Sequence, residues 1–394
     1  MRPVVVISER YSPERFLIND LVKEWNRRGV RLSVLTQVPS YPRDEIYPGF
    51  ENRREERCEN GTRVVRVPTV LGYRRSVRRK ILGYVSFMLR SSLEVLRIAR
   101  GASSVFVYHT GPLTQALAAV FAKLLLGKRV IIWTQDVWPD AVFAYGFRDR
   151  GAAATVLKMF VRLVYRCCDE VLVSSPGFVK RLEPYLCAGK TARYVPQWVP
   201  DEFQLVQPTS LRFDAPGKKF IFSGNIGKMQ NLENVIRAFA RVDPGLATFF
   251  ILGDGSDRAR LETLVRRDGI ANVIFLGTVR QSEVCDAIRQ CDVAVLPLAA
   301  NPLVALTVPA KFQAYLSAGR PIMAVADGET GRLVVEEHLG RRADPDDIDD
   351  IVSVIRSLAS MGDGEREAIS ARTRRLLSEC YSKDAAIDML TNCL

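Results

Sequence analysis

The chain alternates between short apolar runs and longer segments in which apolar residues recur every three or four positions. The runs lack polar alternation, which indicates strands covered on both faces, as in parallel sheets. The longer segments predict amphipathic helices. One has Ile18, Leu21, Val22 and Trp25 on its inner face and ends at Gly29. We expect strands at residues 3–8, 31–36, 63–67, 104–108, 129–133, 170–174, 220–224, 248–253, 273–277, 293–297 and 321–326.

A proline-containing stretch at 195–216 interrupts the alternation, which then restarts. Two such halves predict an α/β fold of two Rossmann-like doubly wound domains facing a cleft. We place the domains at 1–200 and 201–375. The chain end is predicted to be helical, and residues 376–394 are expected to form a C-terminal helix that packs back on the first domain.

Composition narrows the class of protein. Lys and Arg number 56 against 44 Asp and Glu among 394 residues, an excess of 56 − 44 = 12 positive charges. This excess suggests a nucleotide, an anionic membrane or a nucleic acid as partner. The eight cysteines form no C-x-x-C pair and only two histidines are present, which argues against a zinc site and fits a reducing compartment.

No apolar run reaches the ~18 residues of a membrane span, and the apolar run after Met1 is too short for a signal peptide. We expect a cytoplasmic protein, peripheral on the cytosolic face of the inner membrane. The basic, aromatic segment 71–101 is a candidate for the membrane surface, with Arg78, Arg79 and Lys80 ahead of an apolar helix. An ordinary connecting helix with a solvated face is an equal alternative.

A helix is predicted within 306–321, opened by Pro309 and ended by Gly319. Lys311 falls in its first turn, the unfavourable end of the helix dipole for a cation. A solvated lysine would explain the position, and so would an anion that binds at the helix start.

Two further turns in the second half have the composition of phosphate sites. Gly224 and Gly227 follow one strand beside Lys228, and Gly253 and Gly255 follow the next. Ligands of open α/β sheets bind at these carboxyl ends of the strands. Three such loops with two lysines favour a diphosphate as the anion that meets Lys311.

The first half offers acid–base candidates at strand ends. His109 ends one strand, and Asp136 and Asp140 follow another. A carboxylate and an imidazole that face a cleft can bind hydroxyls or transfer protons. A structural histidine and a helix-capping aspartate explain the same residues.

Six segments occur in an order that resembles a known family. They read YSPERFLINDLVKEWNRRGVRLSVLT, PSYPRDEIYPGFE, TQDVWPDAVFAYG, SGNIGKMQNLENVIRAF, LGDGSDRARLE and LTVPAKFQAYLSAGRPIMAVADGE. Over nearly its whole length the chain is similar to the retaining, metal-independent glycosyltransferases of family four, which have the two-domain GT-B fold. It looks most like bacterial O-antigen and capsule enzymes such as N-acetyl-L-fucosamine transferases.

The resemblance implies a sugar nucleotide on the C-terminal domain and an acceptor, often a lipid-linked sugar, on the N-terminal domain. Gly224, Gly253 and Gly255 would lie near the nucleotide, and Thr307, Val308 and Lys311 would meet the diphosphate. Asp136 would contact or deprotonate the acceptor, with His109 as a second catalytic candidate.

The chain departs from the family pattern at several positions. Leu306 and Ala314 stand where the broad family has two glutamates, the second of which usually holds the ribose, so Glu329 or Glu336 or Glu337 is a replacement candidate. Asn225 and Gln230 stand where an Arg/Lys pair is usual, so Lys228 is expected to substitute. Pro13, Glu14, Arg15 and Phe16 replace a glycine-rich loop, which places Arg15 among the candidate nucleotide ligands.

The leading hypothesis is transfer of a sugar from a nucleoside-diphosphate sugar, of the UDP type, to a lipid-linked glycan in bacterial surface polysaccharide assembly. No metal or other cofactor is expected, because lysines and helix-start amides would neutralise the leaving diphosphate. A sugar-nucleotide epimerase of the same fold, and a catalytically silent membrane-bound partner of an assembly complex, are the alternatives. The basic residues match no nucleic-acid module, so no nucleic-acid partner is expected.

Overall fold

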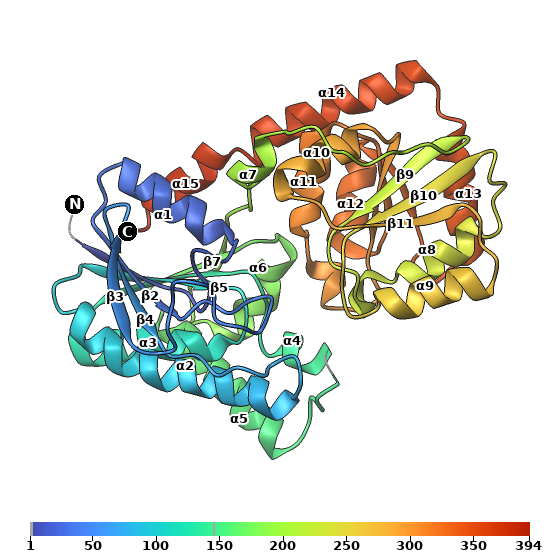
Figure 1. Cartoon of the computed structure of the whole chain (residues 1–394). Helices are drawn as coiled ribbons and strands as arrows, with labels where there is room; N and C mark the ends of the chain where they lie inside the picture. Colours follow the sequence, from blue (N-terminus) through green and yellow to red (C-terminus); the bar gives the residue numbers. More distant parts are fainter. Residues whose placement is uncertain (1–2, 145) are drawn as a thin grey trace. The chain divides into compact units, whose positions relative to one another are not determined.

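The computed structural model describes residues 3–144 and 146–394 (Figure 1). It divides into two compact units. Unit 1 runs to Pro196 and regains Asp384–Leu394, and unit 2 is Gln197–Lys383. The boundaries predicted from the sequence are 200/201 and 375/376. In the structure, residues 197–200 and 376–383 belong to unit 2.

Unit 1 is built on an eight-stranded sheet with the order β3-β4-β2-β1-β5-β6-β7-β8. Its strands are β1 (Val4–Ile7), β2 (Leu32–Gln37), β3 (Glu55–Glu59), β4 (Thr62–Val67), β5 (Ser104–His109), β6 (Arg129–Thr134), β7 (Glu170–Val173) and β8 (Arg193–Tyr194). All pairs are parallel except β3 with β4. The strands β3 and β8 were not predicted from the sequence. Charged, exposed residues dominate β3, and β8 has two residues, so neither carries an apolar run.

The helices of unit 1 cover both faces of this sheet. They are α1 (Leu17–Arg27), α2 (Val77–Ile98), α3 (Leu117–Leu126), α4 (Asp140–Ala144), α5 (Ala152–Cys167), α6 (Gly177–Leu182) and α15 (Lys383–Thr391), with short 3-10 turns at Leu113–Ala116 and Glu183–Tyr185. Figure 1 shows α1 and α15 on one face and α2, α3 and α5 on the other. The apolar stripe of α1 is buried as predicted, and Trp25 meets Phe106 of β5 edge to face.

The chain end is fixed to unit 1 by side chains of α1. The indole Nε1 of Trp25 donates to Thr391 Oγ1 at 2.8 Å, and Arg28 pairs with Asp388. Ile387 and Leu390 of α15 are fully buried. The C-terminal helix predicted at 376–394 is divided between two helices, because α14 ends at Cys380 and α15 begins at Lys383.

Unit 2 contains a parallel six-stranded sheet with the order β11-β10-β9-β12-β13-β14. The strands are β9 (Lys218–Ser223), β10 (Ala247–Leu252), β11 (Val273–Gly277), β12 (Val293–Pro297), β13 (Ile322–Val325) and β14 (Gly340–Ala343). The helices are α7 (Asp201–Gln204), α8 (Leu232–Phe239), α9 (Arg258–Arg267), α10 (Gln281–Arg289), α11 (Ala310–Ala318), α12 (Gly328–Glu336), α13 (Ile348–Ala359) and α14 (Asp363–Cys380), with 3-10 turns at Lys228–Gln230 and Val304–Leu306. The predicted strands of this half are confirmed, and β14 was missed because two arginines interrupt it.

Side chains alternate between two apolar layers on either side of this sheet, as strand geometry requires. Phe220 and Phe222 of β9 enter the layer beneath α8, α9 and α13, and Ile221 between them enters the layer beneath α10 and α11. Burial on both faces explains why the strands are continuous apolar runs. The fold is therefore two doubly wound α/β domains, as predicted.

Candidate active site

The strand order of unit 2 reverses between β9 and β12, since β10 lies beyond β9 and β13 lies beyond β12. Open α/β sheets bind their ligands outside the carboxyl ends of strands at such a point. The loops that follow β9, β10, β12 and β13 begin there. Each leads into a helix or a 3-10 turn, so their backbone N–H groups point toward the same edge.

Close backbone approach holds the first two loops together. A Cβ on Gly253 would lie 1.9 Å from the carbonyl oxygen of Gly224, and one on Gly255 would lie 2.2 Å from that of Ile226. Gly224 and Gly253 also have φ values of +133° and +145°, which side chains with a Cβ rarely adopt. These glycines are needed for loop packing, whatever they also offer a ligand.

The later two loops are joined in a similar way. A Cβ on Gly328 would lie 1.9 Å from the carbonyl oxygen of Ala305, and Thr330 donates its hydroxyl hydrogen bond to Thr307 at 2.8 Å. Thr330 is fully buried. The start of α12 is therefore anchored to the segment that precedes α11.

Lys311 lies in the first turn of α11, as predicted, and its ammonium is enclosed by protein. Its Nζ stands 3.8 Å from the centre of the Phe222 ring, and a Cβ on Gly224 would lie 3.4 Å from it. Within the described chain, Nζ has no hydrogen-bond partner. Burial lowers the pKa of Lys311 to about 7. An anion at this point would supply the missing partner and favour the protonated form.

Neither Phe222 nor Thr330 was predicted from the sequence, although Phe222 contacts the Lys311 ammonium and Thr330 anchors the start of α12. Phe222 offers the face of its ring to the buried ammonium, a contact that partly compensates for lost hydration. Its place two residues before the first loop glycine was the available signal. Thr330 directly follows the candidate Glu329 in the sequence, and this adjacency was its available signal.

The remaining candidates in unit 2 differ in accessibility. Asn225 and Lys228 are exposed, and Asn225 donates to Gln230 Oε1 at 3.4 Å. The Val308 side chain is buried in the apolar layer, so only its backbone could meet a ligand. Glu329 is partly exposed in the first turn of α12 and accepts a 2.7 Å hydrogen bond from Arg332. Its assignment to the ribose stays a prediction.

The first-half candidates lie in unit 1. Asp136 follows β6, and burial raises the pKa of its carboxyl to about 6. His109 ends β5 and is fully buried. Its Nε2 donates to the Gly111 carbonyl at 2.8 Å and its Nδ1 contacts Thr134 Oγ1, while burial lowers its pKa to about 4.

A neutral, enclosed imidazole with both nitrogens engaged has the surroundings of a structural histidine. The geometry therefore favours a structural role for His109 and leaves the Asp136 carboxyl as the candidate for contact with an acceptor hydroxyl. Arg15 is exposed in the loop before α1, on unit 1, whereas the other nucleotide candidates lie on unit 2.

In the described chain, no group of three or more His, Cys, Asp or Glu side chains is arranged to hold a metal ion. The eight cysteines are free thiols. None of the described helices combines the length and apolar character needed to cross a bilayer.

Two doubly wound α/β domains are the architecture of the GT-B class of two-domain transferases. A glycosyl transferase 4-like domain model matches residues 17–198, and a model for glycosyl transferases group 1 matches residues 217–361. The chain is therefore a glycosyltransferase composed of these two family domains.

Individual glycosyltransferases are similar to this chain at low sequence identity. WcaI of Escherichia coli (strain K12), described as a colanic acid biosynthesis glycosyl transferase, is 26% identical over 69% of this chain and 70% of its own. WbjE of Pseudomonas aeruginosa, described as a glycosyltransferase, is 23% identical over 76% of this chain and 75% of its own. The crystal structure of Anabaena HepE with UDP-glucose superposes with a TM-score of 0.72 at 13% identity, over 100% of this chain and 99% of HepE.

Proposed function

We propose that the chain is a retaining, metal-independent glycosyltransferase that moves a sugar from a UDP-sugar to a lipid-linked glycan during bacterial surface polysaccharide assembly. The observation that carries the donor assignment is the buried ammonium of Lys311 at the strand-order reversal, which has no hydrogen-bond partner among the described residues. The UDP-glucose bound by HepE supports a uridine nucleotide, and the description of WcaI supports a polysaccharide product. The N-acetylfucosamine-type resemblance offers an amino sugar as one donor to test.

The site suits departure of a nucleoside diphosphate. When the bond between the sugar carbon C1 and the diphosphate oxygen breaks, negative charge grows on the diphosphate. Lys311, in the first turn of α11, would stabilise this charge, with Lys228 at the adjacent loop. The acceptor oxygen then bonds to C1 on the same face, and its proton passes to the departing phosphate.

Asp136 would position the acceptor hydroxyl. Its pKa of about 6 leaves the carboxylate able to accept a hydrogen bond near neutral pH. Because the leaving phosphate takes the proton, Asp136 need not be protonated during the reaction.

Thermal shift with UDP-, GDP-, dTDP- and ADP-sugars tests the donor assignment. A ligand that binds only the folded chain raises its stability, and we expect the largest shift from a UDP-sugar. Lys311→Ala should remove the shift. Lys218→Ala, at the opposite end of β9, should keep it. A shift of equal size in Lys311→Ala would contradict the site.

Turnover is measured as UDP release in the presence of a bacterial lipid extract. Lys311→Ala should reduce it by about 10²-fold or more, as loss of one transition-state donor does. Near-normal turnover in the folded variant would exclude Lys311. Conversion of the UDP-sugar to an isomer without any extract would favour the epimerase alternative, and tight binding without transfer would favour the silent partner.

An anionic membrane surface is the proposed partner that presents the acceptor. One stripe of α2 is apolar and exposed, including Leu93 at 71% exposure. Exposed apolar residues continue on α3, which packs between α2 and α5, and on α5 itself, with Leu124 65% and Val156 66% exposed. Arg74, Arg75, Arg78 and Arg79 stand exposed ahead of the α2 stripe. Apolar residues beside arginines suit peripheral binding to an anionic leaflet from the cytosolic side.

Flotation with phosphatidylglycerol-containing liposomes tests this partner. The triple variant Leu82→Ser, Leu89→Ser, Leu93→Ser should stay at the bottom of the gradient while the parent chain floats. Leu205→Ser is the matched control, since Leu205 is an equally exposed leucine of unit 2. Equal flotation of the triple variant would contradict docking through α2.

A further inference from the structure

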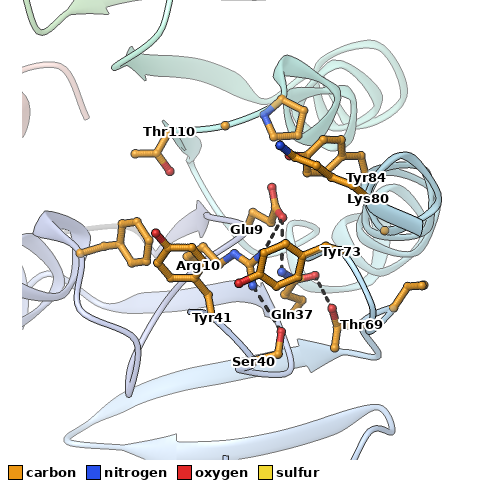
Figure 2. A pocket seen from close by; sticks show the side chains of 15 residues that line it. Glu9, Arg10, Gln37, Ser40, Tyr41, Thr69, Tyr73, Lys80, Tyr84 and Thr110 are labelled. Atoms are coloured by element: carbon orange, nitrogen blue, oxygen red, sulfur yellow. Dashed lines mark hydrogen bonds and ion pairs between the residues drawn. The ribbon is translucent and has the colours of Figure 1, made fainter. Parts of the chain in front are cut away.

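A cavity lies wholly within unit 1, at the carboxyl ends of β1, β2 and β5 (Figure 2). It measures about 230 Å³. The strand order of unit 1 reverses between β1 and β5, because β2 lies beyond β1 and β6 lies beyond β5. The cavity thus occupies the position in unit 1 where open α/β sheets bind ligands. No residue proposed for donor binding lines it.

The floor of this cavity holds a buried carboxylate. Glu9 is 7% exposed. Its Oε1 accepts from Gln37 Nε2 at 3.3 Å and lies 3.5 Å from Arg10 Nη2. No described residue donates a hydrogen bond to its Oε2. Figure 2 shows this second oxygen turned into the cavity on the side of Thr110 and Lys80.

Neighbouring groups fix the Glu9 carboxylate in this orientation. Thr69 Oγ1 donates to Gln37 Oε1 at 2.9 Å, which directs the Gln37 amide nitrogen toward Glu9. Arg10 also contacts Glu14 Oε1 at 3.4 Å, and Glu14 accepts from the backbone N–H of Ser40 at 2.8 Å. A carboxylate held by such a network is a preorganised acceptor for a hydroxyl hydrogen bond.

Aromatic rings form one wall. The rings of Tyr41 and Tyr73 lie 6.4 Å apart at an interplanar angle of 24°, and the Arg10 guanidinium stands 5.3 Å and 5.8 Å from their centres. A pyranose ring presents hydroxyls at its edge and C–H groups on its faces. The cavity matches both, with a carboxylate acceptor on its floor and tyrosine rings at its side. Its volume is below the about 300–1,000 Å³ of drug-sized pockets, which suits one sugar ring.

A phosphate is a poorer match for the same space. The Arg10 charge is already shared between Glu9 and Glu14, and the Oε2 of Glu9 would face an incoming anion at close range. Burial raises the pKa of Glu9, and Arg10 and Lys80 oppose that rise. Lys80 at the rim therefore offsets the charge of the floor.

We propose that this cavity binds one uncharged monosaccharide unit of the acceptor glycan, with Glu9 Oε2 accepting a hydrogen bond from a sugar hydroxyl. The inference rests on the proposed function, because it assigns the glycan part of that acceptor to named residues. Glu9 is a specificity-determining residue in this assignment, and Thr69 and Gln37 are positioning residues.

Saturation-transfer NMR on the full chain tests the assignment with three probes: methyl β-N-acetyl-D-glucosaminide, methyl α-D-galactoside and methyl α-L-fucoside. At least one should bind saturably with UDP present or absent. Glu9→Gln keeps the shape but can turn an N–H group into the cavity, so the affinity should fall about tenfold or more. Tyr73→Ala removes the ring wall without altering the buried carboxylate and should also weaken binding. Glu183→Gln, an exposed carboxylate of unit 1, is the control and should bind as the parent does.

Thermal shift with UDP separates the two proposals. Glu9→Gln should keep the full UDP shift. A parent chain that responds to UDP but binds none of the three glycosides overturns this inference and leaves the proposed function standing. Unchanged glycoside affinity in both Glu9→Gln and Tyr73→Ala overturns it too, as does binding of inorganic phosphate that strengthens in Glu9→Gln. A parent chain without response to any nucleotide sugar contradicts the proposed function instead.

Discussion

Replacing Lys311 with methionine should make the unliganded protein more stable while removing its affinity for UDP. Methionine has a similar length and no charge, so it fills the same space against Phe222. In the parent chain, folding encloses an ammonium that has no hydrogen-bond partner in the described structure. Burial lowers its pKa from an ordinary 10.5 to about 7. The native state therefore disfavours the charged lysine that the unfolded chain carries.

The sign of the pH dependence follows from this difference. Between about pH 7 and 10.5 the unfolded chain holds a proton on Lys311 that the folded chain has lost, so stability rises with pH across this window. Below about pH 7 both the folded and the unfolded chain hold this proton, so the full cost of burying the charged ammonium lowers the stability of the fold. A difference of roughly 3.5 pH units at about 1.4 kcal/mol each corresponds to on the order of 5 kcal/mol. The Phe222 contact lowers this figure, so a gain of a few kcal/mol is expected for Lys311→Met at pH 6.5.

Denaturant unfolding of both chains at pH 6.5 and pH 9.5 measures the effect. The stability difference between variant and parent should shrink at the higher pH, because the parent regains stability there. Lys218→Met, which removes a lysine that is partly exposed beside Asp292, should show no such pH-dependent gain. With UDP at about 100 times its Kd, the parent should gain about 2.7 kcal/mol and Lys311→Met nothing. A variant less stable than the parent at pH 6.5, or a difference independent of pH, would refute the reasoning.

Three further outcomes are expected. Activity should rise as pH increases through about 6 as the Asp136 carboxyl loses its proton, and Asp136→Asn should flatten this limb of the pH–rate profile. Gly253→Ala should destabilise unit 2 by roughly 2–4 kcal/mol, since its Cβ would lie 1.9 Å from a carbonyl oxygen; Gly364→Ala, in open space within α14, should instead be neutral or raise the melting temperature slightly. Deleting residues 384–394 should destabilise unit 1 by several kcal/mol, with a red shift in the fluorescence of the newly exposed Trp25; an unchanged melting temperature and emission would show that α15 adds nothing.

Local pattern was sufficient for the strands that are buried on both faces. An apolar run such as that of β9 is stable as a parallel strand between two helical layers. The position of the strand therefore follows from the sequence. The edge strands β3 and β14 could not be found in this way. Their charged residues face solvent, and only pairing with β4 and β13 makes them strands.

The same contrast holds for the site. Glycines after apolar runs indicated the loops of unit 2. Their meeting at one edge could also be predicted, because a parallel sheet brings the carboxyl ends of all its strands to the same edge. The sequence placed Lys311 in a first helical turn but could not show that its ammonium is enclosed against Phe222, 89 positions earlier in the chain. It also selected His109, whose ring proves to be held by Thr134 and Gly111.

The sequence by itself determined the class of fold, the order of its strands along the chain and the loops that carry glycines and lysines, since these depend on the periodicity of neighbouring residues. Tertiary structure alone decided which charged groups are buried and what surrounds them. Glu9 became a cavity floor because β1, β2 and β5 meet there, and Lys311 acquired its low pKa because β9 and α11 exclude water from its ammonium. Desolvation depends on contacts between residues distant in sequence, and no local pattern records them.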